Sequence, residues 1–184
     1  MLKMNKVSSR VVTIDLQGIA LGNPWTDPFT QYDVSDFMHG LGVITHGQKN
    51  KCKETERQCQ AALVKGKLSS GPCYRLLDDI VAGSGNGKRV SMYDARKYMS
   101  SQGMFPPGKG DVVQYLNRAD VRAAIHATST PHKYEECADP PFNALSHQDG
   151  KGALKELAAV LNDDKNVKVL VYNGQFDIIC NHLG

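Results

Sequence analysis

The sequence lacks the features of a membrane-spanning chain. No apolar run among its 184 residues approaches the roughly 18 to 20 residues needed to cross a bilayer. Lys3, Lys6 and Arg10 are not followed by an apolar stretch, so we do not expect a signal peptide. A dominant charge is also lacking, because 22 basic and 19 acidic residues give a net charge of +3, too small to indicate nucleic-acid binding. The composition, 41% hydrophobic and 22% charged, is that of a globular domain.

Several short motifs are missing as well. The five cysteines include no C-x-x-C pair, which argues against a zinc ribbon or a thioredoxin-like site. The six histidines include no H-E-x-x-H motif, and we interpret them, His126 and His182 among them, as structural. No G-x-S-x-G elbow is present to expose a nucleophilic serine. The glycine-rich segment 83–88 departs from a phosphate-binding loop at Ala82 and Arg89, and it predicts a surface loop.

Two apolar stretches near the ends of the sequence predict strands. The first comprises Val11–Ile14 and Leu16–Leu21 and is closed by Gly22-Asn23-Pro24, and the second is Val167–Tyr172. Near-continuous apolar runs of this kind are typical of strands buried on both faces of a parallel sheet. We predict that Leu16–Leu21 and Val167–Tyr172 are adjacent and parallel, because helices between two strands provide a right-handed crossover.

The residues between these stretches predict helices. Asp27 and Pro28 are typical of an N-cap and a first helical position, and the apolar residues that follow predict one helix stopped by Gly40 and Gly42. Further helices are predicted over 46–67, 74–81, 111–126 as two short helices joined near Asn117, and 154–161. Strand, helices and strand in this order predict an α/β fold with a helical insertion.

Asp177 is the sharpest candidate for a chemical role. It follows the predicted strand 167–172 through a turn at Asn173-Gly174, and open α/β sheets place active sites at the carboxyl ends of their strands. A carboxylate there could orient a histidine and stabilise its imidazolium. The alternative is that Asp177 only caps a helix over 178–183. Cys180, one helical turn further on, would line the same pocket or act as a small core residue.

Two segments carry a resemblance to a known family. Residues 18–32 read GIALGNPWTDPFTQY, and residues 169–184 read VLVYNGQFDIICNHLG. They resemble the strand-and-turn signature and the aspartate motif of the serine carboxypeptidases, the family of carboxypeptidase Y. Segments 93–97, 115–126 and 134–137 follow in the order of that family. The resemblance therefore runs from about Leu16 to Gly184.

The resemblance implies a fold and a site. The fold would be a partial α/β-hydrolase domain over 1–184, with parallel strands and a helical cap insertion over 29–110. Asp177 matches the aspartate of a Ser-Asp-His triad. The positions that line the pocket for the residue before the scissile bond are matched by Trp25, Tyr32, Ile179 and Cys180. Asn23-Pro24 departs from the usual Asn-Gly, so we expect Asn23 to be extended and Trp25 to be re-aimed.

The resemblance also implies that the chain is the central piece of a longer enzyme. In the family the serine elbow precedes the strand at Gly18 and the histidine motif follows Gly184, so we expect two strands with uncovered edges and faces, and no activity from this chain alone. The parent enzyme would hydrolyse C-terminal peptide bonds of peptides or proteins through an acyl-enzyme, without a metal or organic cofactor. It would be vacuolar, lysosomal or secreted, and could be a homodimer. A serine carboxypeptidase-like acyltransferase and a catalytically dead binding homologue are the alternatives.

The same resemblance bears on the cysteines. Because the number of cysteines is odd, at least one thiol stays free or pairs outside the chain in an oxidising compartment. The alternative is that all five are free thiols in the cytosol. Cys137 matches a family cysteine whose partner lies upstream, so it would be unpaired here. Among the remaining cysteines of the insertion we favour a Cys59–Cys73 bridge over Cys52–Cys73. Cys180 has no disulfide partner in the family and is expected to remain a thiol.

Overall fold

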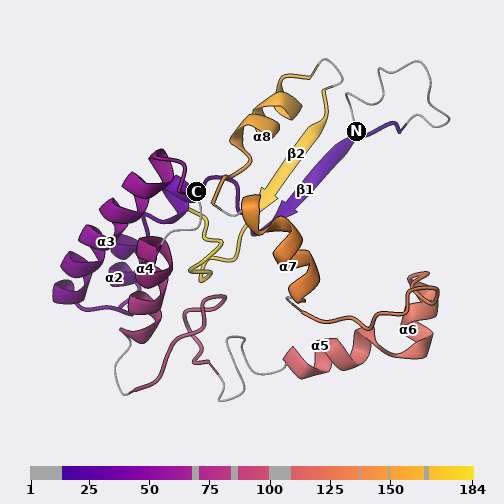
Figure 1. The fold of residues 1–184 in the computed structure, drawn as a ribbon, viewed down its shortest axis with the longest axis horizontal. Coiled ribbons are helices and arrows are strands. Elements are labelled where there is room, and N and C mark those ends of the chain that lie inside the picture. The colour runs from indigo at the N-terminus through magenta and orange to yellow at the C-terminus, as the bar shows by residue number, and fades with distance from the viewer. Residues whose placement is uncertain are drawn as a thin grey trace.

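The computed structural model describes residues 14–67, 71–83, 87–99, 109–136, 138–148, 150–163 and 166–184. Its elements, shown in Figure 1, are β1 (Gly18–Gly22), α1 (Pro28–Gln31), α2 (Ser35–Gly40), α3 (His46–Val64), α4 (Gly71–Ala82), α5 (Lys109–Leu116), α6 (Ala119–Ala124), α7 (Asp139–Leu145), the 3-10 turn η2 (Ser146–Gln148), α8 (Leu154–Leu161) and β2 (Lys168–Tyr172). Within these described ranges, none of the helices has the length and apolar character required to cross a bilayer.

The two strands pair directly and run parallel. Gly18 lies opposite Lys168, and Gly22 lies opposite Tyr172. This confirms the prediction that the first and last readable strands are neighbours, although all the helices that the structure describes lie between them in sequence. The pairing brings the carboxyl ends of both strands together, next to the helical part of the molecule (Figure 1).

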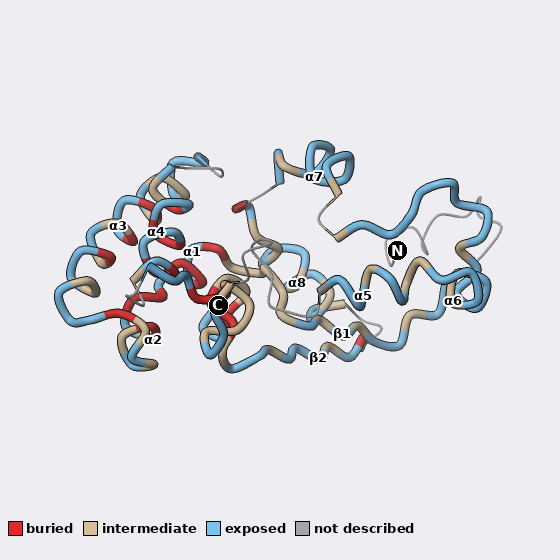
Figure 2. The backbone as a smooth tube through the Cα atoms, turned by 90° about the horizontal axis from the view of Figure 1, so that it is seen from below, coloured by how far each residue is buried: buried red, intermediate tan, exposed pale blue. Residues whose placement is uncertain are grey.

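The strands are more exposed than their composition suggests. Leu170 is 59% exposed and Val171 is 48% exposed, and Figure 2 shows the strands as exposed or intermediate along their length. In the part of the chain that the structure describes, the sheet has two strands and no layer that buries both faces. The edges and faces are thus uncovered, as we expected for a sheet reduced to two strands.

The hydrophobic core lies in the helical lobe, the name we use for α1 to α4 (residues 28–82). Its fully buried side chains include Met38, Leu76 and Ile80 at 0% exposure, and they form the buried region in Figure 2. Ile178, which follows β2 and is also 0% exposed, completes this core. The segment after β2 is therefore packed against the helical lobe.

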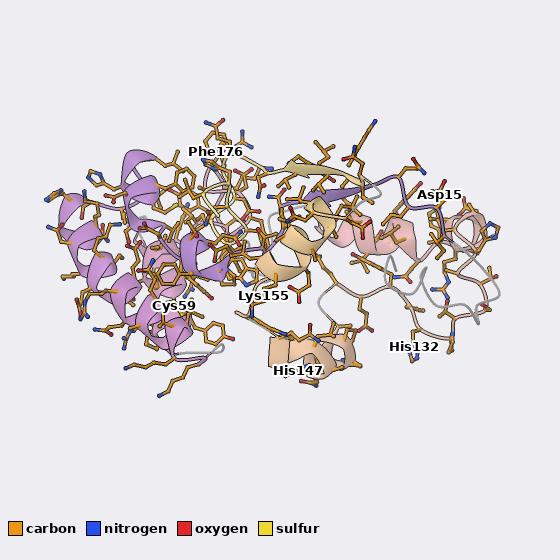
Figure 3. All side chains as sticks on the ribbon, turned by 90° about the horizontal axis from the view of Figure 1, so that it is seen from above. Asp15, Cys59, His132, His147, Lys155 and Phe176 are labelled. Carbon is orange, nitrogen blue, oxygen red and sulfur yellow. A yellow bond between two sulfur atoms is a disulfide. The ribbon has the colours of Figure 1, made fainter. Side chains whose placement is uncertain are left out.

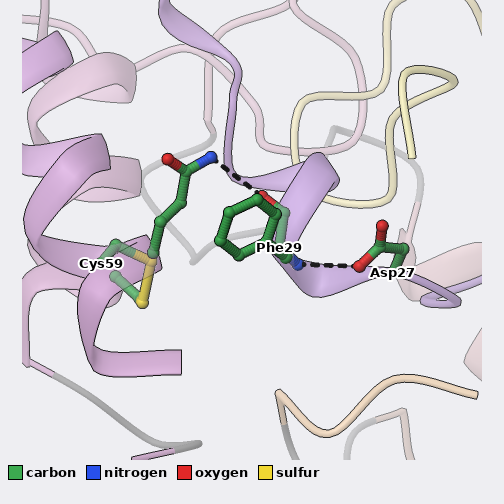
Figure 4. Close-up of a disulfide and its surroundings, with 5 residues drawn as sticks. Asp27, Phe29 and Cys59 are labelled. Atoms are coloured by element: carbon green, nitrogen blue, oxygen red, sulfur yellow. Dashed lines mark hydrogen bonds between the residues drawn. A yellow bond between two sulfur atoms is a disulfide. The ribbon is translucent and has the colours of Figure 1, made fainter. Parts of the chain in front are cut away.

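A disulfide joins the two longest helices of the lobe. Cys59 of α3 is bonded to Cys73 of α4, which confirms the pairing that we favoured. Figure 4 shows the bridge close to Phe29, whose backbone oxygen accepts a hydrogen bond of 3.2 Å from Gln60 Nε2. Cys52 and Cys180 carry free thiols, whereas Cys137 lies outside the described residues.

The predicted helix after Asp27 is wrong in one respect, because it divides into α1 and α2. Asp27 caps α1 as predicted, accepting a bond from the backbone N–H of Phe29. The break occurs where the buried carboxylate of Glu56 accepts the backbone N–H groups of Val34, at 2.9 Å, and Ser35, at 2.5 Å. A side chain from α3 thus takes the donors that a continuous helix would have used.

Three further predictions concern the middle of the chain. α4 begins at Gly71, earlier than predicted, because Pro72 is tolerated in the first turn of a helix. α5 and α6 meet at Asn117 as predicted, and the Asn117 amide fixes the junction by donating to the backbone oxygens of Val113 and Tyr134, both at 2.9 Å. The predicted loop at 83–88 falls largely on residues 84–86, outside the described residues.

Candidate active site

The site lies where the paired strands end. The backbone N–H of Asn23 donates to the carbonyl of Tyr172 at 2.8 Å, one residue beyond β1. From there the first strand leads through Trp25 into α1, and the second leads into residues 173–181, which we call the aspartate loop. Carboxyl ends of neighbouring parallel strands are the usual place for a binding crevice in an α/β sheet.

Asp177 is held in this loop by several donors. It is 5% exposed; its Oδ2 accepts from Asn23 Nδ2 at 2.6 Å, and its Oδ1 accepts from the backbone N–H of Cys180 at 2.8 Å. Burial raises the pKa of Asp177 above its ordinary value, and the bonds from Cys180, Asn23 and the Ile179 backbone act in the opposite direction. A carboxylate offers about four acceptor positions, so the hydrogen bonds from Asn23 and Cys180 leave room for a further N–H group.

The alternative role for Asp177, capping a helix over 178–183, is wrong. Residues 178–184 form successive turns instead of a helix, although the bond to the Cys180 N–H resembles a cap. The backbone N–H groups of Ile178 and Ile179 donate to the carbonyl of Met92, at 2.9 and 3.3 Å. The cap-type bond from the Cys180 N–H is thus present, but the two N–H groups before it are bonded to a tertiary acceptor and no helix follows.

Residues 91–97, which we call the bracing loop, hold the aspartate loop from the side of the helical lobe. Besides the Met92 carbonyl, the N–H of Ala95 donates to the carbonyl of Phe176 at 2.9 Å. The guanidinium of Arg96 lies 4.3 Å from the centroid of the Phe176 ring, and the same group is bonded to Asp94 at 2.9 and 3.0 Å. Figure 3 shows Phe176 in its loop beside the helical lobe.

Asn23 does not have the extended backbone that we expected before Pro24. Its φ is 45°, in the left-handed region that asparagine tolerates better than most residues. Its side-chain Oδ1 accepts the N–H of Gly174 at 3.3 Å while its Nδ2 donates to Asp177. These bonds to the neighbouring strand's loop outweigh the local preference of a residue before proline.

The aromatic residues predicted to line a pocket lie together. Trp25 and Tyr32 make an edge-to-face contact, with ring centroids 5.2 Å apart and ring planes at 89°. Tyr32 belongs to the core, and Trp25 and Ile179 are partly buried against it. The Trp25 indole nitrogen is buried and has no acceptor among the described residues. The structure thus brings Trp25, Tyr32 and Ile179 to one core.

Cys180, the fourth predicted pocket residue, lies with Asp177 and is partly buried. Burial raises the pKa of its thiol to about 11, and the nearby charge of Asp177 acts in the same direction. The thiol is free in the structure, as we expected. Its raised pKa keeps it neutral around pH 7, which makes it a poor nucleophile.

Sequence reasoning missed two polar residues that join these parts. Gln31, 1% exposed, donates from Nε2 to the carbonyl of Pro24 at 2.9 Å, and it also contacts Asn181, which is 0% exposed. Both residues lie inside the two segments that resemble the family, 18–32 and 169–184, and this was the only feature of the sequence that could have indicated them. Among the described residues, no group of three or more His, Cys, Asp and Glu could hold a metal ion.

Comparisons with known proteins agree with this geometry. The family described as serine carboxypeptidase matches residues 1–184. The chain is 41% identical to "Serine carboxypeptidase S10 family member 2" of Dictyostelium discoideum, over 100% of this chain and 33% of that protein. It is 34% identical to "Pheromone-processing carboxypeptidase KEX1" of Phytophthora infestans, over 100% of this chain and 31% of that protein. The chain therefore spans about a third of the length of these relatives.

A solved structure is also similar. The crystal structure of KEX1(delta)P, a prohormone-processing carboxypeptidase from Saccharomyces cerevisiae, matches with a TM-score of 0.76 and 20% identity. The match covers 98% of this chain and 41% of that chain. At this identity the likeness shows the fold, and it confirms the predicted partial α/β-hydrolase architecture.

Proposed function

The chain belongs to the serine carboxypeptidase family, and from this membership we propose that it is a segment of an enzyme that hydrolyses C-terminal peptide bonds. The segment would supply the triad aspartate, Asp177, and part of the substrate pocket. The observation that carries the proposal is the state of Asp177. Its carboxylate is buried, is held by hydrogen bonds from Asn23 and Cys180, and can still accept a further N–H group.

The proposed mechanism is acyl transfer through a covalent intermediate. A serine attacks the carbonyl of the last peptide bond while a histidine takes its proton, and the histidine then protonates the departing amino acid. Water hydrolyses the acyl-enzyme with the same histidine as base. Asp177 accepts the remaining imidazole N–H, fixes the tautomer and stabilises the imidazolium without being protonated itself. An imidazolium beside Asp177 would offset the rise in the pKa of Asp177 that burial causes.

The pocket for the residue before the scissile bond is proposed to include Trp25, Tyr32, Ile179 and Cys180. The edge-to-face pair and the partly buried Ile179 offer an apolar surface, and the neutral Cys180 thiol adds no charge. The substrates would be peptides or proteins with a free C-terminus.

The helical segment and the cysteines fit the same proposal. Residues 29–110 are proposed to be the cap insertion, which would position the aspartate loop through the Met92 carbonyl. The Cys59–Cys73 bridge supports folding in an oxidising compartment, so we propose a vacuolar, lysosomal or secreted parent enzyme.

The test is the Asp177→Asn substitution in the full-length enzyme, assayed by release of the terminal amino acid from an N-blocked dipeptide. We expect kcat to fall by about 10⁴-fold with KM largely unchanged, because an orienting aspartate acts on the base and not on substrate binding. Asp120→Asn is the control and should leave kcat unchanged. Asp120 lies on α6, is exposed and is paired with Arg118. An undiminished kcat in Asp177→Asn would remove Asp177 from the triad. If the unsubstituted enzyme transfers the acyl group to an alcohol or amine in preference to water, it is an acyltransferase.

A further inference from the structure

Asn23 directs both ends of its side chain to the loop that carries Asp177. Its Nδ2 donates to Asp177 Oδ2 at 2.6 Å, and its Oδ1 accepts the N–H of Gly174 at 3.3 Å. Its backbone N–H is bonded to the carbonyl of Tyr172 at 2.8 Å. Asn23 and Asp177 are 154 positions apart in sequence, so one residue after β1 spans from the end of β2 to the carboxylate.

The backbone of Asn23 has an uncommon conformation. A φ of 45° lies in the left-handed region, where residues other than glycine are uncommon and where asparagine is enriched. Backbone conformations of this kind persist only where the surrounding structure holds them, and they cluster at functional sites. Here the three hydrogen bonds of Asn23 hold it, and the side chain reaches Asp177 as a result.

The bond from Asn23 limits the directions from which Asp177 can be approached. Oδ1 already accepts the Cys180 N–H at 2.8 Å. With Oδ2 bonded to Asn23, the acceptor positions that remain open have defined directions. A carboxylate lacking the Asn23 bond could rotate and would offer its free positions in several directions.

We propose that Asn23 is a positioning residue that fixes the rotamer of the Asp177 carboxylate, so that an open acceptor position faces the catalytic imidazole. This inference rests on the proposed role of Asp177 in the triad. Asn23 does not contact the reacting atoms, and its effect passes through Asp177 to the base.

The test uses Asn23→Gly in the full-length enzyme. Glycine adopts a φ of 45° without strain, so this variant deletes the amide and keeps the backbone. Asn166→Gly is the matched control, because Asn166 also has a positive φ, 57°, but lies at an exposed position before β2. We expect Asn23→Gly to lower kcat by about 100-fold, the effect of misplacing a catalytic group by about 1 Å, with KM unchanged. Asn166→Gly should leave both constants unchanged.

A second variant separates positioning from folding. In Asn23→Asp the donor that faces Asp177 Oδ2 becomes a carboxylate oxygen, and a hydrogen bond can form only when the two carboxyl groups share a proton. The ratio of the Asn23→Asp kcat to the unsubstituted kcat should therefore rise as the pH falls. The Cys180 thiol, whose backbone N–H donates to Asp177, has a pKa of about 11 and stays neutral across an acidic to neutral range.

Each outcome decides the inference. A normal kcat in Asn23→Gly overturns it, as does an equal loss in Asn23→Gly and Asn166→Gly. If Asn23→Gly does not fold, the Asn23→Asp ratio decides: a rise towards low pH supports positioning, and a constant ratio overturns it. If Asp177→Asn abolishes activity while Asn23→Gly does not reduce it, only this inference fails. If Asp177→Asn is itself fully active, the proposed function fails.

Discussion

Gln31 and Asn181 exchange two hydrogen bonds across 150 positions of sequence. Asn181 Nδ2 donates to the Gln31 carbonyl at 2.8 Å, and Gln31 Nε2 reaches the Asn181 carbonyl at 3.4 Å. Both residues are almost completely buried. The pair therefore joins the end of α1 to the aspartate loop.

Asn181→Ala should weaken the contact between α1 and the aspartate loop. The substitution leaves the carbonyl oxygens of Gln31 and Ile178 without the Asn181 amide, and each buried polar group without a partner costs about 1 to 3 kcal/mol. We expect a lower Tm for the full-length enzyme and faster amide exchange in the aspartate loop. Asn162→Ala, which removes an exposed bond at the end of α8, is the control. Equal Tm values for the two variants would contradict this account.

Glu56 should contribute more to stability than its neighbour Glu54. Glu56 is 3% exposed, accepts the N–H groups of Val34 and Ser35, and pairs with Lys53 at 3.0 Å. Without Glu56 these two N–H groups have no acceptor, and each buried polar group without a partner costs about 1 to 3 kcal/mol. Glu54 and Arg57 form an exposed pair at 53% and 70% exposure, worth about 1 kcal/mol or less. Thermal unfolding of Glu56→Ala and Glu54→Ala compares them, and a similar loss in both would count against our description.

The cysteines give a prediction that mass mapping can check. Alkylation of the unfolded chain without a reductant should label Cys52 and Cys180 and leave the Cys59 and Cys73 peptides linked. The bridge spans 14 positions, and closing a loop of about 15 residues stabilises a fold by roughly 3 kcal/mol. Replacing both bridged cysteines with serine should lower the Tm, whereas Cys52→Ala, a small change of packing, should lower it less. A Cys52–Cys73 peptide would contradict this assignment.

The titration of Cys180 should depend on Asp177. Burial, and then the charge of Asp177, raise the pKa of the Cys180 thiol from 9.0 to about 11. Stability linked to this raised pKa is fully present below about pH 9 and is lost as the pH rises through about 11. Asp177→Asn removes the smaller cause, so the pKa should fall part of the way towards 9.0. The pH dependence of Cys180 alkylation in the folded enzyme measures this, and an unchanged midpoint would show that the two groups do not interact.

The 184-residue chain expressed alone should be inactive and prone to aggregate. Under the proposed function Asp177 only orients a base, and we expect the serine and the histidine to come from outside these residues. Triad members act as a unit, so the aspartate alone should accelerate nothing. The sheet exposes Leu170 at 59% and Tyr172 at 57%, and α8 exposes Leu161 at 60%; apolar surface of this extent favours association. Size-exclusion chromatography and a fluorophosphonate probe test both statements. A compact monomer or a labelled serine would each refute one of them.

Local patterns predicted most of the elements. The Asp27 cap, the meeting of two helices at Asn117 and the two apolar strands follow from residues that lie close together in sequence. The pairing of the strands needed one further rule, the right-handed crossover. The aspartate could be singled out because it follows a strand, and the family resemblance then gave it a role.

Features that depend on distant partners could not be predicted. The break between α1 and α2 is caused by Glu56, on another helix, and the turns after Asp177 are caused by the Met92 carbonyl. The φ of Asn23 opposes the local preference of a residue before proline. α7 begins with Asp139-Pro140-Pro141, where prolines suggest a break although the first helical turn tolerates them.

The Met92 carbonyl has a consequence for how this segment can vary. Met92 lies in the bracing loop, outside the sheet, yet it fixes the backbone directly after Asp177 by accepting the N–H groups of Ile178 and Ile179. Residues 29–110 therefore cannot be exchanged for the corresponding segment of a relative without regard to the aspartate loop. A chimera that takes residues 29–110 from a relative would need to reproduce the backbone path at Met92 to within a hydrogen-bond length, even if every residue of the aspartate loop were kept.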